Sequence, residues 1–221
     1  MSSDLVLYGY WRSSAAYRVR IALNLKGLAY DNRPVHLVRD GGEQHQQAYR
    51  ALNPQELVPC LVDGAQVLTQ SMAIMEYLDE THPAPALLPA DAAGRARVRS
   101  LAQLLACDVH PLGNLRVLQY LGSELHVEES MRGSWSRHWI GEGFRALEAM
   151  LADSPATGRY CHGDLPSLAD ACLVPQHYNA VRWKLPMEEF PTIRRIVDAC
   201  QALEAFKRAA PEAQPDAPAV D

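Results

Sequence analysis

The stretch from Leu5 to Leu23, LVLYGYWRSSAAYRVRIAL, predicts the fold of the first part of the chain. It opens with an apolar run, Leu5–Tyr8, that is typical of a buried strand, and continues into apolar residues at helical spacing over Ser14–Lys26. Gly27 follows, at the position where a glycine commonly ends a helix. A strand that passes directly into a helix begins a βα unit, so we expect an α/β domain here.

Strand and helix patterns continue to alternate as far as His82. Asp63-Gly64 is a strong hairpin signal, because both residues favour the tight turn that joins two antiparallel strands. The pattern predicts, in order, a strand over Tyr30–Val38, a short helix over Glu43–Leu52, strands over Leu57–Val62 and Gln66–Leu68, and a helix over Ser71–His82. This order, βαβ, short helix, ββα, predicts a mixed sheet in a compact α/β domain.

The character of the chain changes after a proline-rich segment, Pro83–Pro89, which we expect to be a linker. Beyond it, apolar residues recur at helical spacing with little strand signal. The predicted helical segments are Ala92–Leu121, Met131–Leu151, Leu168–Arg182 and Ile193–Arg208. We therefore expect two domains, residues 1–83 and the all-helical residues 90–221, with a mobile tail rich in alanine, proline and acidic residues from Ala209.

The composition bounds the class of protein. The chain has 221 residues and a formal net charge of −5, which offers no electrostatic case for binding nucleic acid or an anionic membrane surface. No apolar run approaches the ~20 residues of a membrane span. The five cysteines form no CxxC pair, so we expect small buried residues rather than disulfides or a zinc site, in a reducing, cytoplasmic compartment. The eight histidines lack HxxxH and HExxH spacing, so no metal centre is expected.

Ser13 and Ser14 stand where the first predicted strand passes into the first predicted helix. The N–H groups and the positive dipole end of a helix N-terminus favour an anion there. The simpler interpretation is that one serine only caps the helix. The same two interpretations apply to Gln70-Ser71, where Ser71 can cap the next helix or bind the carboxylate of an amino-acid ligand.

Pro59 follows Val58 at the start of a predicted strand. A proline cannot donate a hydrogen bond within a sheet, so it lies at an edge, at a bulge or after a cis peptide bond. A cis bond would expose the backbone N–H and C=O of Val58 to a peptide ligand. An ordinary edge proline is the alternative.

Together and in this order, these motifs resemble the N-terminal, thioredoxin-like domain of glutathione transferases. More narrowly, Arg12-Ser13-Ser14-x-x-x-Arg18-Val19-Arg20-Ile21-Ala22-Leu23 is similar to the signature of the zeta class, which includes maleylacetoacetate isomerases. The likeness continues over nearly the whole chain, in Ala51–Pro54, Val58-Pro59, Gln70-Ser71, His110–Leu112, Asn114–Leu118, Gly163-Asp164, Ala169-Asp170, Leu173–Gln176 and Ala210–Glu212. Ala15 departs from the class, in which many members have a cysteine, so any chemistry of that cysteine is absent here.

The resemblance implies a glutathione-transferase fold, α/β followed by all-α, that assembles as a homodimer and uses glutathione as its cofactor. It implies that Ser13, or else Ser14, stabilises the glutathione thiolate. The other residues that it places at glutathione are Gln44, Val58, Gln70, Ser71, His110 and Asn114.

Three arginines are candidates for binding the substrate. Arg116 and Arg182 interrupt otherwise apolar helical patterns, and the simpler interpretation is that their side chains are solvated. Arginine also binds carboxylates through its planar fork. Within the resemblance, Arg182 matches a family arginine that faces the substrate, and Arg116 matches the arginine of bacterial isomerases. Arg12 lies beside the expected thiol site, so the three suit a substrate with two negative ends.

The activity that the resemblance favours is glutathione-dependent cis–trans isomerisation of maleylacetoacetate to fumarylacetoacetate, a step of tyrosine and phenylalanine breakdown. The implied chemistry is covalent catalysis by a cofactor thiol acting on a small unsaturated diacid. The alternatives are isomerisation of maleylpyruvate in gentisate breakdown, and general glutathione transfer or haloacid dehalogenation. A binding module without catalysis is disfavoured because both the serine pair and the arginines are present.

Overall fold

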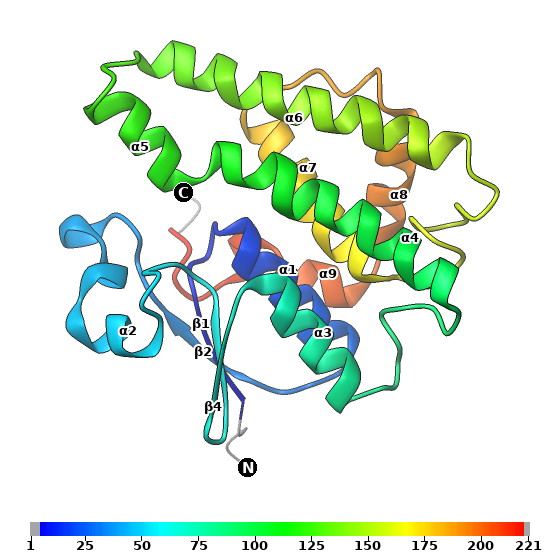
Figure 1. Cartoon of the computed structure of the whole chain (residues 1–221), viewed down its shortest axis with the longest axis horizontal. Coiled ribbons are helices and arrows are strands. Elements are labelled where there is room, and N and C mark those ends of the chain that lie inside the picture. Colours follow the sequence, from blue (N-terminus) through cyan, green and yellow to red (C-terminus); the bar gives the residue numbers. More distant parts are fainter. Residues whose placement is uncertain (1–4, 219–221) are drawn as a thin grey trace. The chain divides into compact units, whose positions relative to one another are not determined.

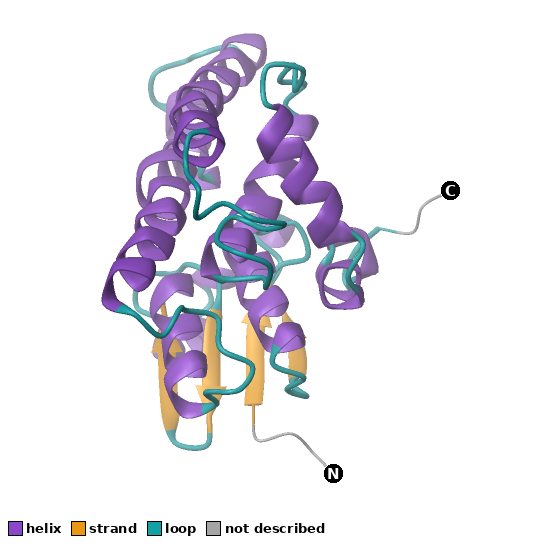
Figure 2. Cartoon of the chain, turned by 90° about the vertical axis from the view of Figure 1, so that its right-hand side faces the viewer, coloured by secondary structure: helices purple, strands orange, loops and turns teal. Residues whose placement is uncertain are grey.

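Strand β1, Leu5–Gly9, lies inside a four-stranded sheet in this computed structural model, which describes residues 5–218. The strand order is β2-β1-β3-β4. β2, Asp31–Pro34, runs parallel to β1, whereas β3, Cys60–Asp63, is antiparallel both to β1 and to β4, Gln66–Thr69. Figure 2 shows the four strands side by side. The predicted mixed sheet is confirmed.

Two predicted elements of this region are shorter in the structure. β2 ends at Pro34, well before the predicted Val38, because its partner β1 ends at Gly9, whose carbonyl accepts the last bond from the Val35 N–H at 2.6 Å. The predicted helix over Glu43–Leu52 is divided into a 3₁₀ turn, Glu43–His45, and helix α2, Gln47–Leu52. Gln46 separates them because its backbone is extended (φ −71°, ψ 145°).

Helices cover both faces of the sheet. On one face α1, Ser14–Leu25, packs against α3, Ser71–Thr81, and α2 lies on the other face (Figure 1). Tyr49 of α2 is buried against Cys60 of β3. Alternate side chains of a strand point to opposite faces, so Leu61, the next residue of β3, points toward α1 and α3 and is fully buried.

The second compact unit of the structure, Leu88–Gln201, is helical. Its helices are α4, Ala92–Gln103; α5, Leu115–Ser123; α6, Glu129–Ala152; α7, Leu168–Arg182; and α8, Pro191–Gln201. α7 starts with a capping box, in which the Ser167 N–H and hydroxyl both donate to Asp170 Oδ2, at 2.8 and 2.9 Å. This reciprocal cap satisfies N–H groups at the buried helix start, so it stabilises the central helix of the unit.

The predicted helix over Ala92–Leu121 is interrupted. After α4 the chain forms a π-helical turn, Leu104–Val109, and then a 3₁₀ turn, His110–Gly113. Pro111 has no N–H to continue the helical ladder, and Asn114 is extended (φ −64°, ψ 146°), so α5 starts afresh.

Residues 202–218 belong to the first unit, together with residues 5–87, although we expected a helical domain over residues 90–221. Helix α9, Glu204–Ala209, packs against α1. Asn24 Nδ2 of α1 donates to the Ala205 carbonyl at 2.9 Å. The predicted helix over Ile193–Arg208 is divided between α8 and α9, because the backbone of Leu203 is extended (φ −83°, ψ 136°).

The expected mobile tail from Ala209 is ordered over its described part. A 3₁₀ turn, Pro211–Ala213, follows α9, and Pro211 is buried. Gln214, also buried, donates from Nε2 to the carbonyls of Arg208 and Ala210, both at 2.9 Å. The composition of the tail resembles that of a disordered segment, but these contacts fold it back on the first unit.

Two expectations from composition can be compared with the described residues. All five cysteines are free; Cys107 is exposed and the other four are buried, as expected for small core residues. Within residues 5–218 no helix is both long enough and apolar enough to cross a membrane.

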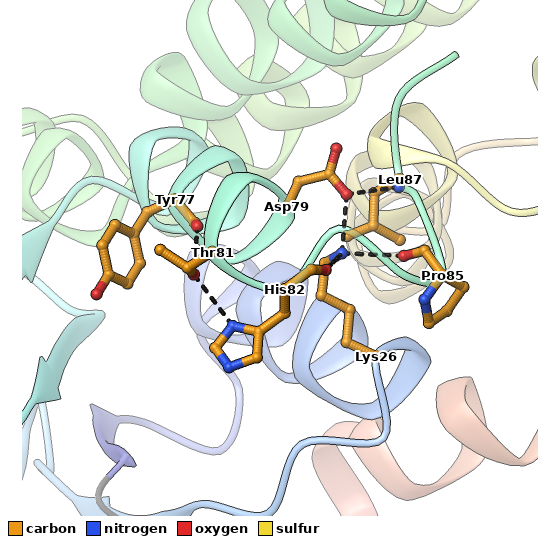
Figure 3. A network of polar contacts seen from close by, with 7 residues as sticks. All are labelled: Lys26, Tyr77, Asp79, Thr81, His82, Pro85 and Leu87. Atoms are coloured by element: carbon orange, nitrogen blue, oxygen red, sulfur yellow. Dashed lines mark hydrogen bonds and ion pairs between the residues drawn. The ribbon is translucent and has the colours of Figure 1, made fainter. Parts of the chain in front are cut away.

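A buried ion pair joins α1, α3 and the proline-rich segment (Figure 3). Lys26 Nζ lies 2.8 Å from Asp79 Oδ1, with 0% and 9% of the two side chains exposed. Nζ also donates to the carbonyls of His82 at 2.7 Å and Pro85 at 2.9 Å. Asp79 Oδ1 in turn accepts from the Leu87 N–H at 2.7 Å. The segment expected to be a linker is therefore held against the first unit by these bonds.

Replacing Lys26 with methionine should lower the free energy of unfolding by about 3–5 kcal/mol, because Asp79 would stay buried without its cation. Urea unfolding monitored by circular dichroism measures this. Lys207→Met, at an exposed lysine of α9, is the matched control and should change stability by less than ~0.5 kcal/mol. Equal stability of the two variants would contradict a stabilising role for the buried pair.

Candidate active site

One edge of the sheet gathers the polar motifs of the first unit. Tyr8 of β1 is the register partner of Cys60, the first residue of β3, and Cys60 is the partner of Thr69, the last residue of β4. The end of β1, the start of β3 and the end of β4 therefore lie at the same edge of the sheet, and so do the loops attached there. These segments carry Ser13, Val58 and Ser71.

Ser13 caps α1. Its Oγ accepts from the Ala16 N–H at 3.2 Å and its carbonyl accepts from the Tyr17 N–H at 2.8 Å. A hydroxyl that accepts a hydrogen bond still has its own O–H to donate. The two interpretations of Ser13 are thus compatible, since a capping hydroxyl can also donate to an anion at the helix N-terminus. Ser14, the first residue of α1, is buried.

The Val58-Pro59 peptide bond is cis, one of the two interpretations that the motif left open. The preceding carbonyl, that of Leu57, accepts from the Tyr49 hydroxyl at 2.6 Å and from Asn53 Nδ2 at 2.7 Å. Within residues 5–218 no hydrogen bond is found on the backbone N–H or C=O of Val58. The loop therefore presents a donor and an acceptor side by side, which is the arrangement that pairs with an extended peptide.

A buried cation, Arg18 of α1, lies beside the N-terminus of α3. Arg18 is 2% exposed, and its Nη1 donates to Ser71 Oγ at 3.2 Å. Gln70 before it has a positive φ of 69°, and its Nε2 donates to Gln55 Oε1 at 2.7 Å. A guanidinium beside a helix N-terminus adds to the positive potential there, so this corner favours a carboxylate. Ser14 precedes Arg18 by four residues on α1 and so shares its helix face.

Gln44 lies in a turn between β2 and α2. Its side chain is buried beside Gly42, and Nε2 lies 3.4 Å from the Leu37 carbonyl. Its Oε1 is buried without a hydrogen-bond partner in the described part of the chain. A buried, unsatisfied oxygen is costly, which makes it suited to accept an N–H from a bound ligand.

Cys60 is the thiol nearest in sequence to these motifs. Burial raises the pKa of Cys60 to about 11, so its thiol stays protonated at neutral pH. Burial also raises the pKa of the neighbouring Tyr49. The edge thus has hydrogen-bond donors and a cation for an anionic ligand but no thiolate of its own.

The other candidates lie in the second unit. Asn114 caps α5, its Oδ1 accepting from the Arg116 N–H at 3.1 Å, and the Arg116 side chain is exposed. His110 opens the 3₁₀ turn before it. Arg182, at the end of α7, is exposed with its guanidinium 4.7 Å from the centre of the Trp183 ring.

Both arginine-bearing segments of this unit are tied to α6. Trp135 Nε1 donates to the Leu112 carbonyl at 2.7 Å, just before α5, and Arg137 Nη1 donates to the Trp183 carbonyl at 3.3 Å. The N-terminal half of α6 therefore holds both the turn before α5, which carries Arg116, and the end of α7, which carries Arg182. Arg12 belongs to the first unit, where its guanidinium stacks 5.3 Å from the Trp11 ring.

Arg18 and Arg20 also lie at this edge but were not among the predicted site residues. Both are essentially buried, at 2% and 1% exposed. Arg20 Nη1 and Nη2 donate to the carbonyls of Tyr10 and Trp11, in the loop that leads to Ser13. The signal was present, because both arginines interrupt an apolar helical pattern, as Arg116 and Arg182 do.

Comparisons with known proteins agree with this arrangement. A family model, glutathione S-transferase N-terminal domain, matches residues 7–86. Over 214 residues the chain is 55% identical to a probable maleylacetoacetate isomerase from Vibrio cholerae serotype O1, covering 97% of this chain and 99% of that protein.

Two solved structures are similar over almost the whole chain. One is the holo structure of a maleylpyruvate isomerase, a bacterial glutathione transferase of the zeta class, with TM-score 0.94, 51% identity, and coverage of 96% of this chain and 100% of that one. The other is a maleylacetoacetate isomerase from Methylobacterium extorquens AM1 with bound malonate and glutathione, with TM-score 0.93, 44% identity, and coverage of 97% and 100%.

Proposed function

The chain belongs to the zeta class of the glutathione transferase family, and from that premise we propose that it isomerises maleylacetoacetate to fumarylacetoacetate with glutathione as cofactor. The observation that carries the proposal is the sheet edge. There a capping serine, an unengaged Val58 backbone pair and the Arg18–Ser71 corner suit the thiol, the peptide and a carboxylate of glutathione. The reaction is a step of tyrosine and phenylalanine breakdown.

Glutathione, when bound, supplies a thiolate that can add reversibly to an activated cis double bond and so permit rotation about it. The residues of the chain hold and orient the reactants. Ser13 Oγ–H donates to the sulfur, which favours the thiolate over the thiol. Val58 would pair with the peptide backbone of glutathione and Gln70 and Ser71 would bind its carboxylate end, while the buried Arg18 would add positive charge behind Ser71. Gln44, His110 and Asn114 complete the glutathione contacts.

The arginines bind the diacid in this proposal. Arg12, Arg116 and Arg182 would hold its two negative ends and stabilise the negative charge that develops on the acyl group. The exposure of Arg116 and Arg182 supports this, because a guanidinium that solvent reaches is also accessible to a carboxylate, and the stacking on Trp183 orients the Arg182 side chain.

The proposed enzyme is a homodimer of the cytoplasm. Free cysteines support a reducing compartment, where glutathione is available. The second candidate is a maleylpyruvate isomerase of gentisate breakdown, favoured by the 51% identity and the TM-score of 0.94 to such an enzyme.

Steady-state assays with maleylacetoacetate and maleylpyruvate, each with and without glutathione, test the proposed function. We expect isomerisation only with glutathione and a higher kcat/KM for maleylacetoacetate. A higher kcat/KM for maleylpyruvate would assign the second candidate. If the enzyme instead conjugates an uncharged electrophile and leaves both diacids unchanged, the isomerase proposal is wrong.

Ser13→Ala should raise the pKa of bound glutathione and lower kcat about 10- to 1000-fold, the scale of losing one oxyanion-type donor. The thiolate absorbance of the complex, followed against pH, measures the pKa. Ser13→Thr keeps the hydroxyl and should retain most activity, and Ser123→Ala, at the exposed end of α5, is the control. An unchanged thiol pKa in Ser13→Ala would assign the thiolate to Ser14 or to backbone N–H groups.

Arg116→Ala and Arg182→Ala should each lower kcat/KM for the diacid about 10- to 150-fold, since one charge-assisted contact contributes roughly 1.5–3 kcal/mol. The glutathione KM should move little for Arg182→Ala and more for Arg116→Ala, whose neighbour Asn114 is a proposed glutathione ligand. Arg145→Ala, at an exposed arginine of α6 that pairs with Glu142, is the control. Equal losses with an uncharged electrophile would argue that these arginines do not bind the substrate.

A further inference from the structure

The peptide groups of Trp11 are held on both sides. The Trp11 N–H donates to Asp216 Oδ2 at 2.9 Å, and the Trp11 carbonyl accepts from Arg20 Nη2 at 2.9 Å. Asp216 lies 205 residues away along the chain and is half-buried. A charged acceptor and a charged donor thus fix one residue of the loop between β1 and α1.

The contacts of Arg20 extend to Ser13 through the carbonyl of Tyr10. The Tyr10 carbonyl accepts from Arg20 Nη1 at 3.4 Å and from the Ser13 N–H at 3.0 Å. The loop over residues 10–13 is therefore a turn in which Arg20 binds the carbonyls of Tyr10 and Trp11 and Asp216 binds the Trp11 N–H. The position of the Ser13 hydroxyl depends on that turn.

Asp216 belongs to a C-terminal segment that several hydrogen bonds hold in place. Gln214 accepts at Oε1 from Asn32 Nδ2 at 3.2 Å, and donates to the carbonyls of Arg208 and Ala210. Arg20 Nε donates to the Ala209 carbonyl at 2.9 Å. The same guanidinium therefore binds the C-terminal segment and the loop before Ser13.

We infer that Asp216 is a positioning residue for the thiolate site: by holding the Trp11 N–H it keeps the turn over residues 10–13 in the geometry that aims Ser13 at the glutathione sulfur. The inference rests on the proposed function. It assigns a role in the reaction to a C-terminal segment whose composition resembles that of a disordered tail.

The charge of Asp216 and its hydrogen bond predict opposite effects on the thiol. In the described part of the chain, the charged and titratable groups around the loop include Arg12, Asp216, His36, whose ring lies 5.1 Å from that of Tyr10, and Arg20, which interacts with Tyr17 and Tyr30. Removing a negative charge near a thiolate stabilises the thiolate and lowers the thiol pKa. Releasing the loop weakens the hydrogen bond from the Ser13 hydroxyl to the sulfur, and this raises the thiol pKa.

The test compares Asp216→Ala and Asp216→Asn in the full-length enzyme. The thiolate absorbance of bound glutathione is titrated against pH, and kcat and the glutathione KM are measured with the better of the two diacids. In Asp216→Ala the thiol pKa should rise and kcat should fall about 3- to 30-fold, a share of one charge-assisted bond. The glutathione KM should change less than about twofold, because Val58 and Ser71 lie on other segments.

Asn keeps an acceptor oxygen for the Trp11 N–H but lacks the charge, so Asp216→Asn should recover most of the kcat, with a thiol pKa equal to or below that of the unmodified enzyme. Asp153→Ala, an exposed aspartate at the end of α6, is the matched control and should behave as the unmodified enzyme. A lowered or unchanged thiol pKa in Asp216→Ala would overturn the inference, and so would an Asn variant as impaired as the Ala variant. If the unmodified enzyme forms no bound thiolate, the proposed function fails instead.

Discussion

Helix α1 and Lys26, the residue that caps its C-terminus, bury three cations, and each must find oxygen partners because an unpaired buried charge would cost several kcal/mol. Arg18 donates to Ser71 at the start of α3, and Arg20 donates to Ala209 at the end of α9. Lys26 pairs with Asp79 and binds two carbonyls of the proline-rich segment. The segments that supply these oxygens are far apart in the chain. The requirement to satisfy three cations on one helix therefore brings them together in the first unit.

The same requirement shapes the candidate site, because the N-terminus of α1 is also where Ser13 lies. Burial lowers the pKa of Arg20 to about 10, which still leaves the guanidinium charged at neutral pH. It can thus bind the loop before Ser13 throughout the physiological range. Arg18 plays the corresponding part at the second helix N-terminus, through Ser71. Arg18 and Arg20 therefore both stabilise the fold and provide positive charge beside the candidate anion site.

The sequence predicted the parts of this arrangement that depend on local rules. The apolar run Leu5–Tyr8 and the Asp63-Gly64 turn describe the sheet correctly, because each acts over a few residues. The Val58-Pro59 motif by itself left a cis bond and an ordinary edge proline open, and the structure has the cis bond. Long-range contacts were missed. Nothing near Asp216 indicates that it meets Trp11, and an apolar helix pattern alone does not say which oxygens Arg20 will reach. From the sequence, capping of the helix and binding of a ligand by Ser13 were two alternative interpretations. A hydroxyl can accept one hydrogen bond and donate another, so Ser13 can do both.

Under the proposed function, the two units differ in how closely their chemistry is coupled to the fold. In the first, backbone groups of Val58 and buried side chains such as Arg18 serve the ligand, and changing them would disturb the packing of the sheet edge. In the second, Arg116 and Arg182 are exposed on helix ends, and their loss would leave the core of that unit intact. Glutathione binding is therefore constrained by stability, while the choice of diacid can change at little structural cost. This explains in physical terms how a maleylacetoacetate isomerase and a maleylpyruvate isomerase can both be more than half identical to this chain.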